Sequence, residues 1–399
     1  MQRLTKVFYS NVNKHMDLAA FSLIFLSTSL RLFYALTRDL FPSGPDGPWY
    51  MQVMSDFAKF GAFSTKISFL PFYPSGYPFV FSIFPRMSDS NWNAFAQSTQ
   101  ILLLGIAITV WYYWISSIFN KPVGLISVLM VSLSTSWIVF PGEAMYESFL
   151  ISLLMLYYSF IYLKLKKGDI SYHFYVVAGL AAGFILTVHP RTLPLLLLPI
   201  VLLVGKKLNY VKAISCVFSF LVFPLFFAFR NYIGTGQFTL FSASLTSYNF
   251  GHQVSLNGNS IFDIFTKAIS YPFSFIHDTI INSLYFFSPF SGPLARGLWF
   301  HNISAYTFLA RSGYTNIAIG ISFIVSLAAF IFLVIGLKVL FRNSRELFIF
   351  FFGGIFILYL TDALIYGENR HRLVAYIFTL PVYANLFWIS LKKRNFPKN

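Results

Sequence analysis

A series of long apolar segments, recurring along most of the chain, is the feature that most limits how this sequence can fold. About ten segments approach the roughly 17–25 apolar residues that cross a bilayer as a helix. They lie near residues 18–36, 95–118, 122–140, 146–163, 172–188, 192–205, 211–229, 315–340, 347–366 and 373–391. Because a chain inside lipid must satisfy its backbone hydrogen bonds internally, these segments predict an all-α polytopic membrane protein.

Composition supports this class and excludes several others. Only 11% of the 399 residues are charged and 57% are hydrophobic, whereas a soluble domain carries about 25% charged residues. The single cysteine, Cys216, lies in an apolar segment, so neither a disulfide framework nor a cysteine-based zinc site fits. The net charge of +16 comes from basic residues between the apolar segments. This pattern favours contact with anionic lipid, and we expect no nucleic-acid partner.

Lysine positions predict how the chain crosses the bilayer. About 17 mostly polar residues precede the first apolar segment and no small-residue cleavage site follows it, so we expect an uncleaved signal anchor. With a cytoplasmic N-terminus, 13 of the 16 lysines fall on the cytoplasmic side, as the positive-inside rule requires. We therefore expect an integral protein of a bacterial inner or plasma membrane, with both termini cytoplasmic.

The outer side has a different character. Nine of the 13 arginines and ten of the 13 carboxylates fall outside or at outer ends of segments in this topology. Arginine suits bidentate recognition of phosphate, so the expected chemistry is reaction of an anionic lipid headgroup. The first and fourth outer loops, residues 37–94 and 230–314, are long, and we expect amphipathic helices in both. The chain is predicted to be one domain, 1–399, without a separate soluble C-terminal domain.

The first outer loop holds the main catalytic candidate. Asp46 lies in a Pro/Gly turn cluster, SGPDGPWY, and suits a general base that takes the proton of an attacking hydroxyl. It suits equally well an N-cap for a helix that begins near Pro48, and the two roles are compatible. In the amphipathic run that follows, one helical face is predicted to carry Tyr50, Val53, Met54, Phe57 and Phe60.

Two further acids, Glu143 and Glu147, lie one helical turn apart at the outer mouth of an apolar segment, in PGEAMYESFL. One of them could orient the acceptor, and Glu143 with Asp46 could hold a divalent cation. The alternative is a favourable anionic first turn at a helix N-terminus. No other cofactor is expected.

Candidate phosphate ligands are the arginines at outer helix ends, namely Arg191, Arg230, Arg370 and Arg372. Arg370 and Arg372 flank His371 just before the last apolar segment, where a clamp on a leaving phosphate competes with a snorkelling interfacial pair. Arg191 and Arg230 are open between clamp and interface anchor. His189 and His371 fit hydrogen-bonded interface residues better than metal ligands.

The sequence resembles the GT-C class of polytopic glycosyltransferases, near the bacterial relatives of protein O-mannosyltransferases and lipid A aminoarabinose transferases. The resemblance rests on four stretches that occur in the order expected of the class. They are DGPWYMQVMSDFAKFG with PFYPSGYPFVFS, GEAMYES, FRNYIGTGQFTLFSASLTSYNFG and GENRHRLVAYIFTLP. Together they extend over nearly the whole chain.

This resemblance implies a sugar donor on polyprenyl phosphate and transfer at the extracytoplasmic face to a hydroxyl of a glycan, lipid or protein. Asp46 matches the first-loop catalytic acid of the class, Glu143 the second-loop acid, and Arg370 or Arg372 the phosphate-side arginine of the last loop. Two departures exist. Gly47 replaces a second acid of the protein O-mannosyltransferases, which disfavours protein acceptors, and His371 stands where tyrosine is usual.

We therefore predict a bundle similar to the GT-C class that transfers a sugar by an inverting single displacement. Candidate contacts to acceptor or donor are Tyr50, Tyr73, Tyr77, Glu147, His189 and His371. Two alternatives stay open: a lipid-linked-sugar flippase or other transporter, and an oligosaccharide polymerase or ligase. A transporter would place ionisable residues near mid-membrane and often shows internal repeats. In this sequence the apolar segments are nearly free of charge and no repeat is found, which favours the enzyme.

Overall fold

The protein is seen here as a computed structural model. It describes residues 2–38, 40–41, 47–68, 74–88, 90–134, 137–138, 140–167, 171–189, 192–196, 210–240, 269–270, 272–273, 276, 315–361 and 372–395. Every regular element within these ranges is a helix, so the all-α prediction is confirmed for this part of the chain.

Within the described residues, six helices are long and apolar enough to cross a membrane. They are His15–Arg38 of α1 (Gln2–Arg38), α5 (Trp92–Ile118), Tyr146–Lys164 of α8 (Tyr146–Lys167), α11 (Tyr210–Thr235), Ile324–Asn343 of α16 (Thr315–Asn343) and Leu373–Lys392 of α18 (Arg372–Asn395). Three shorter helices lie among them, α6 (Lys121–Leu133), α9 (Tyr172–Val188) and α17 (Arg345–Thr361). A membrane-embedded bundle fits this set, and the number of ten crossings stays a prediction.

The predicted span 122–140 is wrong in its second half. α6 ends at Leu133, Ser134 is extended with φ −71° and ψ 119°, and a short 3-10 helix, η2 (Phe140–Gly142), precedes α8. Two backbone carbonyls of this break accept from the guanidinium of Arg31 in α1: Trp137 O from Nε at 2.5 Å and Val131 O from Nη2 at 3.4 Å. The broken segment therefore exchanges helical hydrogen bonds for a buried side-chain donor.

The predicted span 192–205 is described only over residues 192–196. There the hydroxyl of Tyr158 in α8 donates to the backbone oxygen of Leu195 at 2.8 Å. This short piece therefore packs on α8, and its continuation lies outside the described residues.

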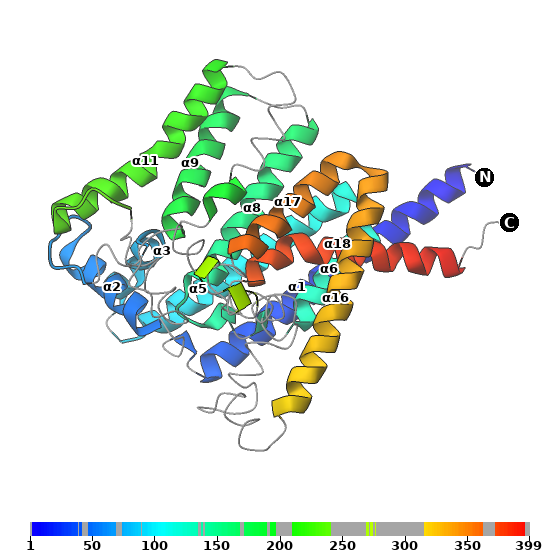
Figure 1. Cartoon of the computed structure of the whole chain (residues 1–399), viewed down its shortest axis with the longest axis horizontal. Coiled ribbons are helices and arrows are strands. Elements are labelled where there is room, and N and C mark those ends of the chain that lie inside the picture. The colour runs from blue at the N-terminus through cyan, green and yellow to red at the C-terminus, as the bar shows by residue number, and fades with distance from the viewer. Residues whose placement is uncertain are drawn as a thin grey trace.

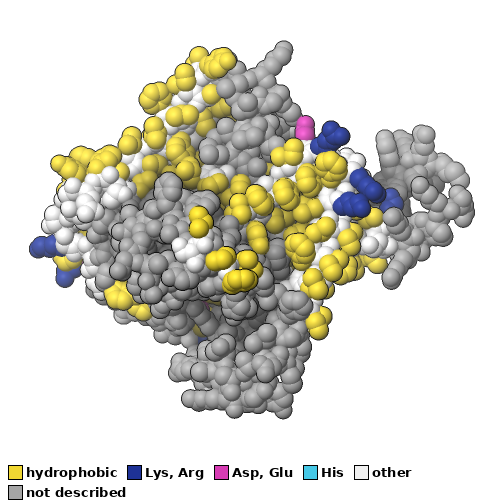
Figure 2. All heavy atoms as spheres, viewed as in Figure 1, with side chains coloured by type: hydrophobic (Ala, Val, Ile, Leu, Met, Phe, Trp, Pro, Cys, Tyr) yellow, Lys and Arg dark blue, Asp and Glu magenta, His cyan; other side chains and the backbone are white. Residues whose placement is uncertain are grey.

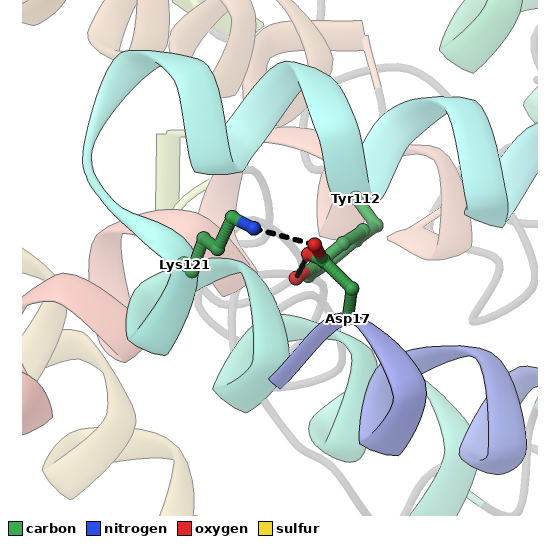
Figure 3. A network of polar contacts seen from close by, with 3 residues as sticks. All are labelled: Asp17, Tyr112 and Lys121. Carbon is green, nitrogen blue, oxygen red and sulfur yellow. Dashed lines mark hydrogen bonds and ion pairs between the residues drawn. The ribbon is translucent and has the colours of Figure 1, made fainter. Parts of the chain in front are cut away.

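One end of the bundle, which we call the lysine-rich end, brings together the start of α1, the end of α5 and the start of α6. Asp17 of α1 accepts from Nζ of Lys121 at 2.5 Å and from the hydroxyl of Tyr112 at 2.7 Å (Figure 3). Nζ of Lys166, near the end of α8, donates to the backbone oxygen of Ser117 at 2.8 Å. These contacts fix α1 and α5 as antiparallel neighbours.

α9 and α11 lie side by side as one arm of the molecule (Figure 1). Gly179 and Gly183, four residues apart on α9, face the backbone of α11. A Cβ would lie 2.3 Å from Cys216 O at the first position and 2.0 Å from Phe220 O at the second. Only glycine permits this approach, which is the small-residue packing typical of membrane helices.

The opposite end, the loop end, carries three helices between α1 and α5: α2 (Gly47–Phe60), α3 (Gly76–Phe81) and α4 (Ile83–Met87). α2 buries Tyr50, Val53, Met54 and Phe57 of the predicted apolar face, whereas Phe60 at its end is 36% exposed. Arg86 of α4 donates to the last carbonyls of α2, Phe57 O at 2.9 Å and Ala58 O at 3.2 Å. The loop helices thus form a packed layer.

The surface suits lipid over much of the bundle. In Figure 2, hydrophobic side chains cover the described parts of α11, α16 and α17, and Lys and Arg side chains gather beside the turn between α16 and α17. Phe25 of α1 and Phe218 of α11 are 71% and 69% exposed, which a bilayer explains and water does not.

Candidate functional site

The candidate site lies at the loop end and is centred on the start of α3. The hydroxyl of Tyr77, a fully buried residue, donates to Oε1 of Gln100 in α5 at 2.8 Å. The hydroxyl of Ser75 accepts from Nη2 of Arg230 in α11 at 2.8 Å. Between them, a Cβ at Gly76 would lie 2.9 Å from a carbonyl oxygen in the last turn of α9. Three consecutive residues therefore connect α5, α9 and α11.

Two buried glutamines of α5 hold the segment that carries Glu143. Nε2 of Gln100 donates to the backbone oxygens of Pro141 and Glu143, both at 2.9 Å. Nε2 of Gln97 donates to Gly142 O at 2.8 Å. These side-chain amides satisfy carbonyls that η2 leaves without helical partners, and so they fix the chain at the entry to α8.

Both acids of this segment are buried: Glu143 is 2% exposed and Glu147 is 1% exposed. Glu147 lies in the first turn of α8, where the helix dipole favours a carboxylate. Glu143 lies in a bend before α8, so the prediction that the two acids lie one turn apart on a helix is wrong for Glu143. Burial, with the negative charge of Glu147, holds the pKa of Tyr77 well above its usual range. The hydroxyl of Tyr77 therefore remains a proton donor.

Aromatic rings connect the two acids to α2 and α9. The ring of Tyr50 meets Tyr77 at 5.4 Å and Tyr146 at 6.2 Å, both edge to face. Tyr146 stacks on His189, at the C-terminal end of α9, with ring centroids 4.5 Å apart. The predicted contacts Tyr50, Tyr77 and His189 therefore belong to one buried polar and aromatic cluster.

Asp46, the predicted base, lies outside the described residues, which resume on its two sides at Phe41 and Gly47. The backbone oxygen of Phe41 accepts from the amide of Ala144 at 2.8 Å, one residue after Glu143. Gly47 is buried and begins α2, within one residue of the predicted helix start.

Arg230 is the one predicted phosphate ligand whose side chain is described. It is 1% exposed, and its guanidinium carbon lies 4.7 Å from the ring centroid of Phe57 in α2 and 5.9 Å from that of Phe227. This burial favours the clamp over a snorkelling interface anchor for Arg230, and both roles stay predictions.

The remaining predicted site residues give no side-chain geometry. Those outside the described residues are Tyr73, Arg191, Arg370 and His371. Arg372 is placed only by its backbone, as the first residue of α18. Their roles stay predictions.

Sequence reasoning missed Gln97, Gln100, Ser75 and Tyr146. A signal existed for the glutamines, because two amides three residues apart share one face of an otherwise apolar segment. It also missed Asp56 of α2, whose buried carboxylate accepts from Nε2 of Gln52 at 2.9 Å and from the amide of Ser68 at 2.8 Å. Both carboxylate oxygens of Asp56 are therefore hydrogen-bonded within the protein, which indicates a structural role. Asp56 can serve as a control when the other acids of the loop end are substituted.

In the part of the chain that the structure describes, no three His, Cys, Asp or Glu residues group so that they could hold a metal ion. The predicted cation between Asp46 and Glu143 includes a residue outside that part. Comparison of the chain with protein-family models and with curated proteins gives no match.

Proposed function

We propose that this chain is a membrane glycosyltransferase that moves a sugar from a polyprenyl-phosphate donor to a hydroxyl acceptor at the extracytoplasmic face. The observation that carries the proposal is the burial of two carboxylates, Glu143 and Glu147, beside the Tyr77–Gln100 hydrogen bond at the loop end. Burying a carboxylate is costly, and acids kept in such a place are functional candidates. A fold that needed only stability would gain more from apolar residues here.

The chemistry is a single displacement. The acceptor oxygen attacks the anomeric carbon, the bond from that carbon to the phosphate oxygen breaks, and polyprenyl phosphate leaves with the bonding electron pair. The acceptor proton passes to the carboxylate of Asp46, and the anomeric configuration inverts. Asp46 precedes α2 directly, and α2 contributes Tyr50 to the buried cluster.

The described residues have distinct parts in this proposal. Glu143, held through its backbone by Gln100, orients the acceptor or shares a divalent cation with Asp46. Tyr77 stays protonated and keeps its hydrogen bond to Gln100, so it fixes the geometry without titrating. His189, at the end of α9, stacks on Tyr146 and so connects α9 to the cluster. Preorganised groups of this kind favour the transition state.

The leaving phosphate gains negative charge as the sugar departs, so cationic donors are required near it. The candidates are Arg191, Arg230, Arg370 and Arg372. A guanidinium fork suits this role because it presents several N–H groups to phosphate oxygens at once.

The test is sugar transfer from a synthetic polyprenyl-phosphate sugar by the purified protein in nanodiscs. Asp46→Asn preserves much of the capping ability of Asp46 but is a poor base, so we expect transfer to fall at least ~100-fold in a folded protein. Asp56→Asn is the matched control: it alters an acid of the same loop that is already held by Gln52 and Ser68. Its transfer rate per folded molecule should stay within a few-fold of wild type.

Three outcomes decide between the alternatives. Near-normal transfer by Asp46→Asn would leave Asp46 with a capping role only. Movement of the lipid across the bilayer without release of polyprenyl phosphate would replace the enzyme by a flippase. Transfer of whole oligosaccharides would replace it by a polymerase or ligase.

A further inference from the structure

Two arginines are buried in the membrane helices, and their surroundings differ. Arg31 of α1 is 0% exposed, and all three of its nitrogens donate hydrogen bonds. Nε donates to Trp137 O, Nη1 to the hydroxyl of Ser27 and Nη2 to Val131 O. Arg31 is thus a structural residue whose three guanidinium nitrogens all have protein partners. It is the reference for a buried guanidinium that binds no ligand.

Arg230 is nearly as buried, at 1% exposed, but it is not satisfied in this way. Only Nη2 has a hydrogen-bond partner, the hydroxyl of Ser75 at 2.8 Å. Nε and Nη1 have none among the described residues, and the one ion pair found there joins Lys121 to Asp17 at the other end of the bundle. Burial of a cation with two unpartnered nitrogens is strongly unfavourable unless an anion compensates it.

We propose that Arg230 and Ser75 form an anion subsite that holds the phosphate of a prenyl phosphate. This inference rests on the proposed function and makes it more specific, because it places the lipid phosphate at α11 and α3. Phosphate offers several oxygens, which can accept from Nε and Nη1 together. The hydroxyl of Ser75 accepts from Arg230 and keeps its own proton to donate to a phosphate oxygen.

The surroundings of the guanidinium favour a phosphate that carries an apolar chain. Phe57 and Phe227 flank the cation and exclude water, which strengthens its attraction for an anion. The rings of Phe63, just after α2, and Phe229, next to Arg230 in α11, are in edge-to-face contact with centroids 6.5 Å apart, and the two residues are 48% and 52% exposed. A prenyl chain could lie along this exposed aromatic rim while its headgroup reaches Arg230.

The subsite is coupled to the acid cluster through a short path. Ser75, which contacts Arg230, is two residues from Tyr77, which contacts Gln100. Gly76 between them fits closely against the end of α9, so this turn cannot shift freely. Phosphate held at Arg230 would therefore stand at a fixed position relative to Glu143.

The experiment measures binding without sugar transfer, as the rise in thermal unfolding midpoint of the full chain in detergent. The probes are geranyl phosphate, geraniol, sodium phosphate and phosphatidylglycerol. We expect geranyl phosphate to raise the midpoint and geraniol not to. Arg230→Gln should weaken geranyl phosphate binding about 10-fold or more, the loss typical of a charge-assisted contact. Arg230→Lys should recover part of it, because the charge returns without the fork.

The controls make each outcome decisive. Arg31→Lys should lower the basal midpoint but keep the response to geranyl phosphate, because Arg31 is saturated by protein groups. Ser75→Ala is the second variant, should Arg230→Gln fail to fold, and it should weaken binding as well. An equal response to sodium phosphate would assign the subsite to free phosphate, and a response to phosphatidylglycerol alone would assign it to bulk lipid; either result overturns the prenyl-phosphate assignment.

Failure of this subsite can be told apart from failure of the proposed function. If sugar is transferred but Arg230→Gln and Ser75→Ala bind geranyl phosphate as wild type does, the subsite is wrong and the transferase stands. If geranyl phosphate binds through Arg230 but no sugar is transferred, the subsite stands and the transferase is wrong.

Discussion

Gln100 is the residue whose loss should report most directly on the candidate site. Its side chain makes three buried hydrogen bonds: it donates to Pro141 O and Glu143 O at 2.9 Å and accepts from the hydroxyl of Tyr77 at 2.8 Å. Gln100→Leu keeps a similar side-chain volume and the helical preference of the position. The substitution therefore isolates the loss of hydrogen bonding.

The expected magnitude follows from these three bonds. At about 1 kcal/mol net for each, Gln100→Leu should reduce the free energy of unfolding by about 3 kcal/mol. Tyr77→Phe removes one of the same bonds, at about 1 kcal/mol. The double variant should lose about 3 kcal/mol, less than the sum of the two single losses, because the Tyr77–Gln100 bond counts in both. The coupling between the two residues should be about 1 kcal/mol.

The assay is equilibrium unfolding in mixed detergent micelles, with sugar transfer measured on the same samples. Gln97→Leu is the matched control, because Gln97 donates to Gly142 O and Ala35 O but does not contact Tyr77. Gln97→Leu should show no coupling to Tyr77→Phe. Additive losses for Gln100→Leu and Tyr77→Phe would refute the hydrogen bond on which the cluster is built.

Two further predictions concern packing and topology. Gly183→Ala places a Cβ 2.0 Å from Phe220 O, well inside the 3.4 Å at which ordinary contact begins, so α9 and α11 must separate. We expect a loss of about 1–3 kcal/mol in the same unfolding assay, and an unchanged stability would contradict the close approach of these helices. Cysteines at Thr65 and Lys166, both exposed, should label from outside and from the cytoplasm respectively in a Cys216→Ala background. Labelling of both positions from the same side would contradict the predicted topology.

Helix type and position were predictable from the sequence where one force dominates. Long apolar runs predicted the positions of α5, α8, α11 and the candidate membrane span of α1, His15–Arg38, to within a few residues, because burial in lipid or protein is the main requirement there. The start of α1 at Gln2 was not predicted. The amphipathic period of α2 likewise predicted which face is buried. The close packing of α9 on α11 had a sequence signal, two glycines four residues apart, that the prediction did not use.

Local pattern failed where a distant side chain replaces a local hydrogen bond. The run 122–140 is apolar enough to continue as a helix, but the helix ends at Leu133. Arg31, about 100 positions earlier in the chain, donates hydrogen bonds to backbone oxygens at this break. Similarly, Glu143 lies in a bend and not in a helix, and Gln100 of α5 donates a hydrogen bond to its backbone oxygen. Neither partnership is visible as a period or a motif, because it depends on which helices become neighbours.

The same limit explains why residue type could not separate the two buried arginines. Each lies in an apolar helix near the end that is predicted to be outer, and each appears in the sequence as an isolated cation. Their difference is in the supply of carbonyl and hydroxyl oxygens: the break after α6 offers oxygens to Arg31, whereas Arg230 faces aromatic rings and one serine. Aromatic rings stabilise a cation by about 0.5–2 kcal/mol but accept no strong hydrogen bond. The guanidinium of Arg230 therefore keeps two nitrogens, Nε and Nη1, for hydrogen bonds to an anion from outside the protein.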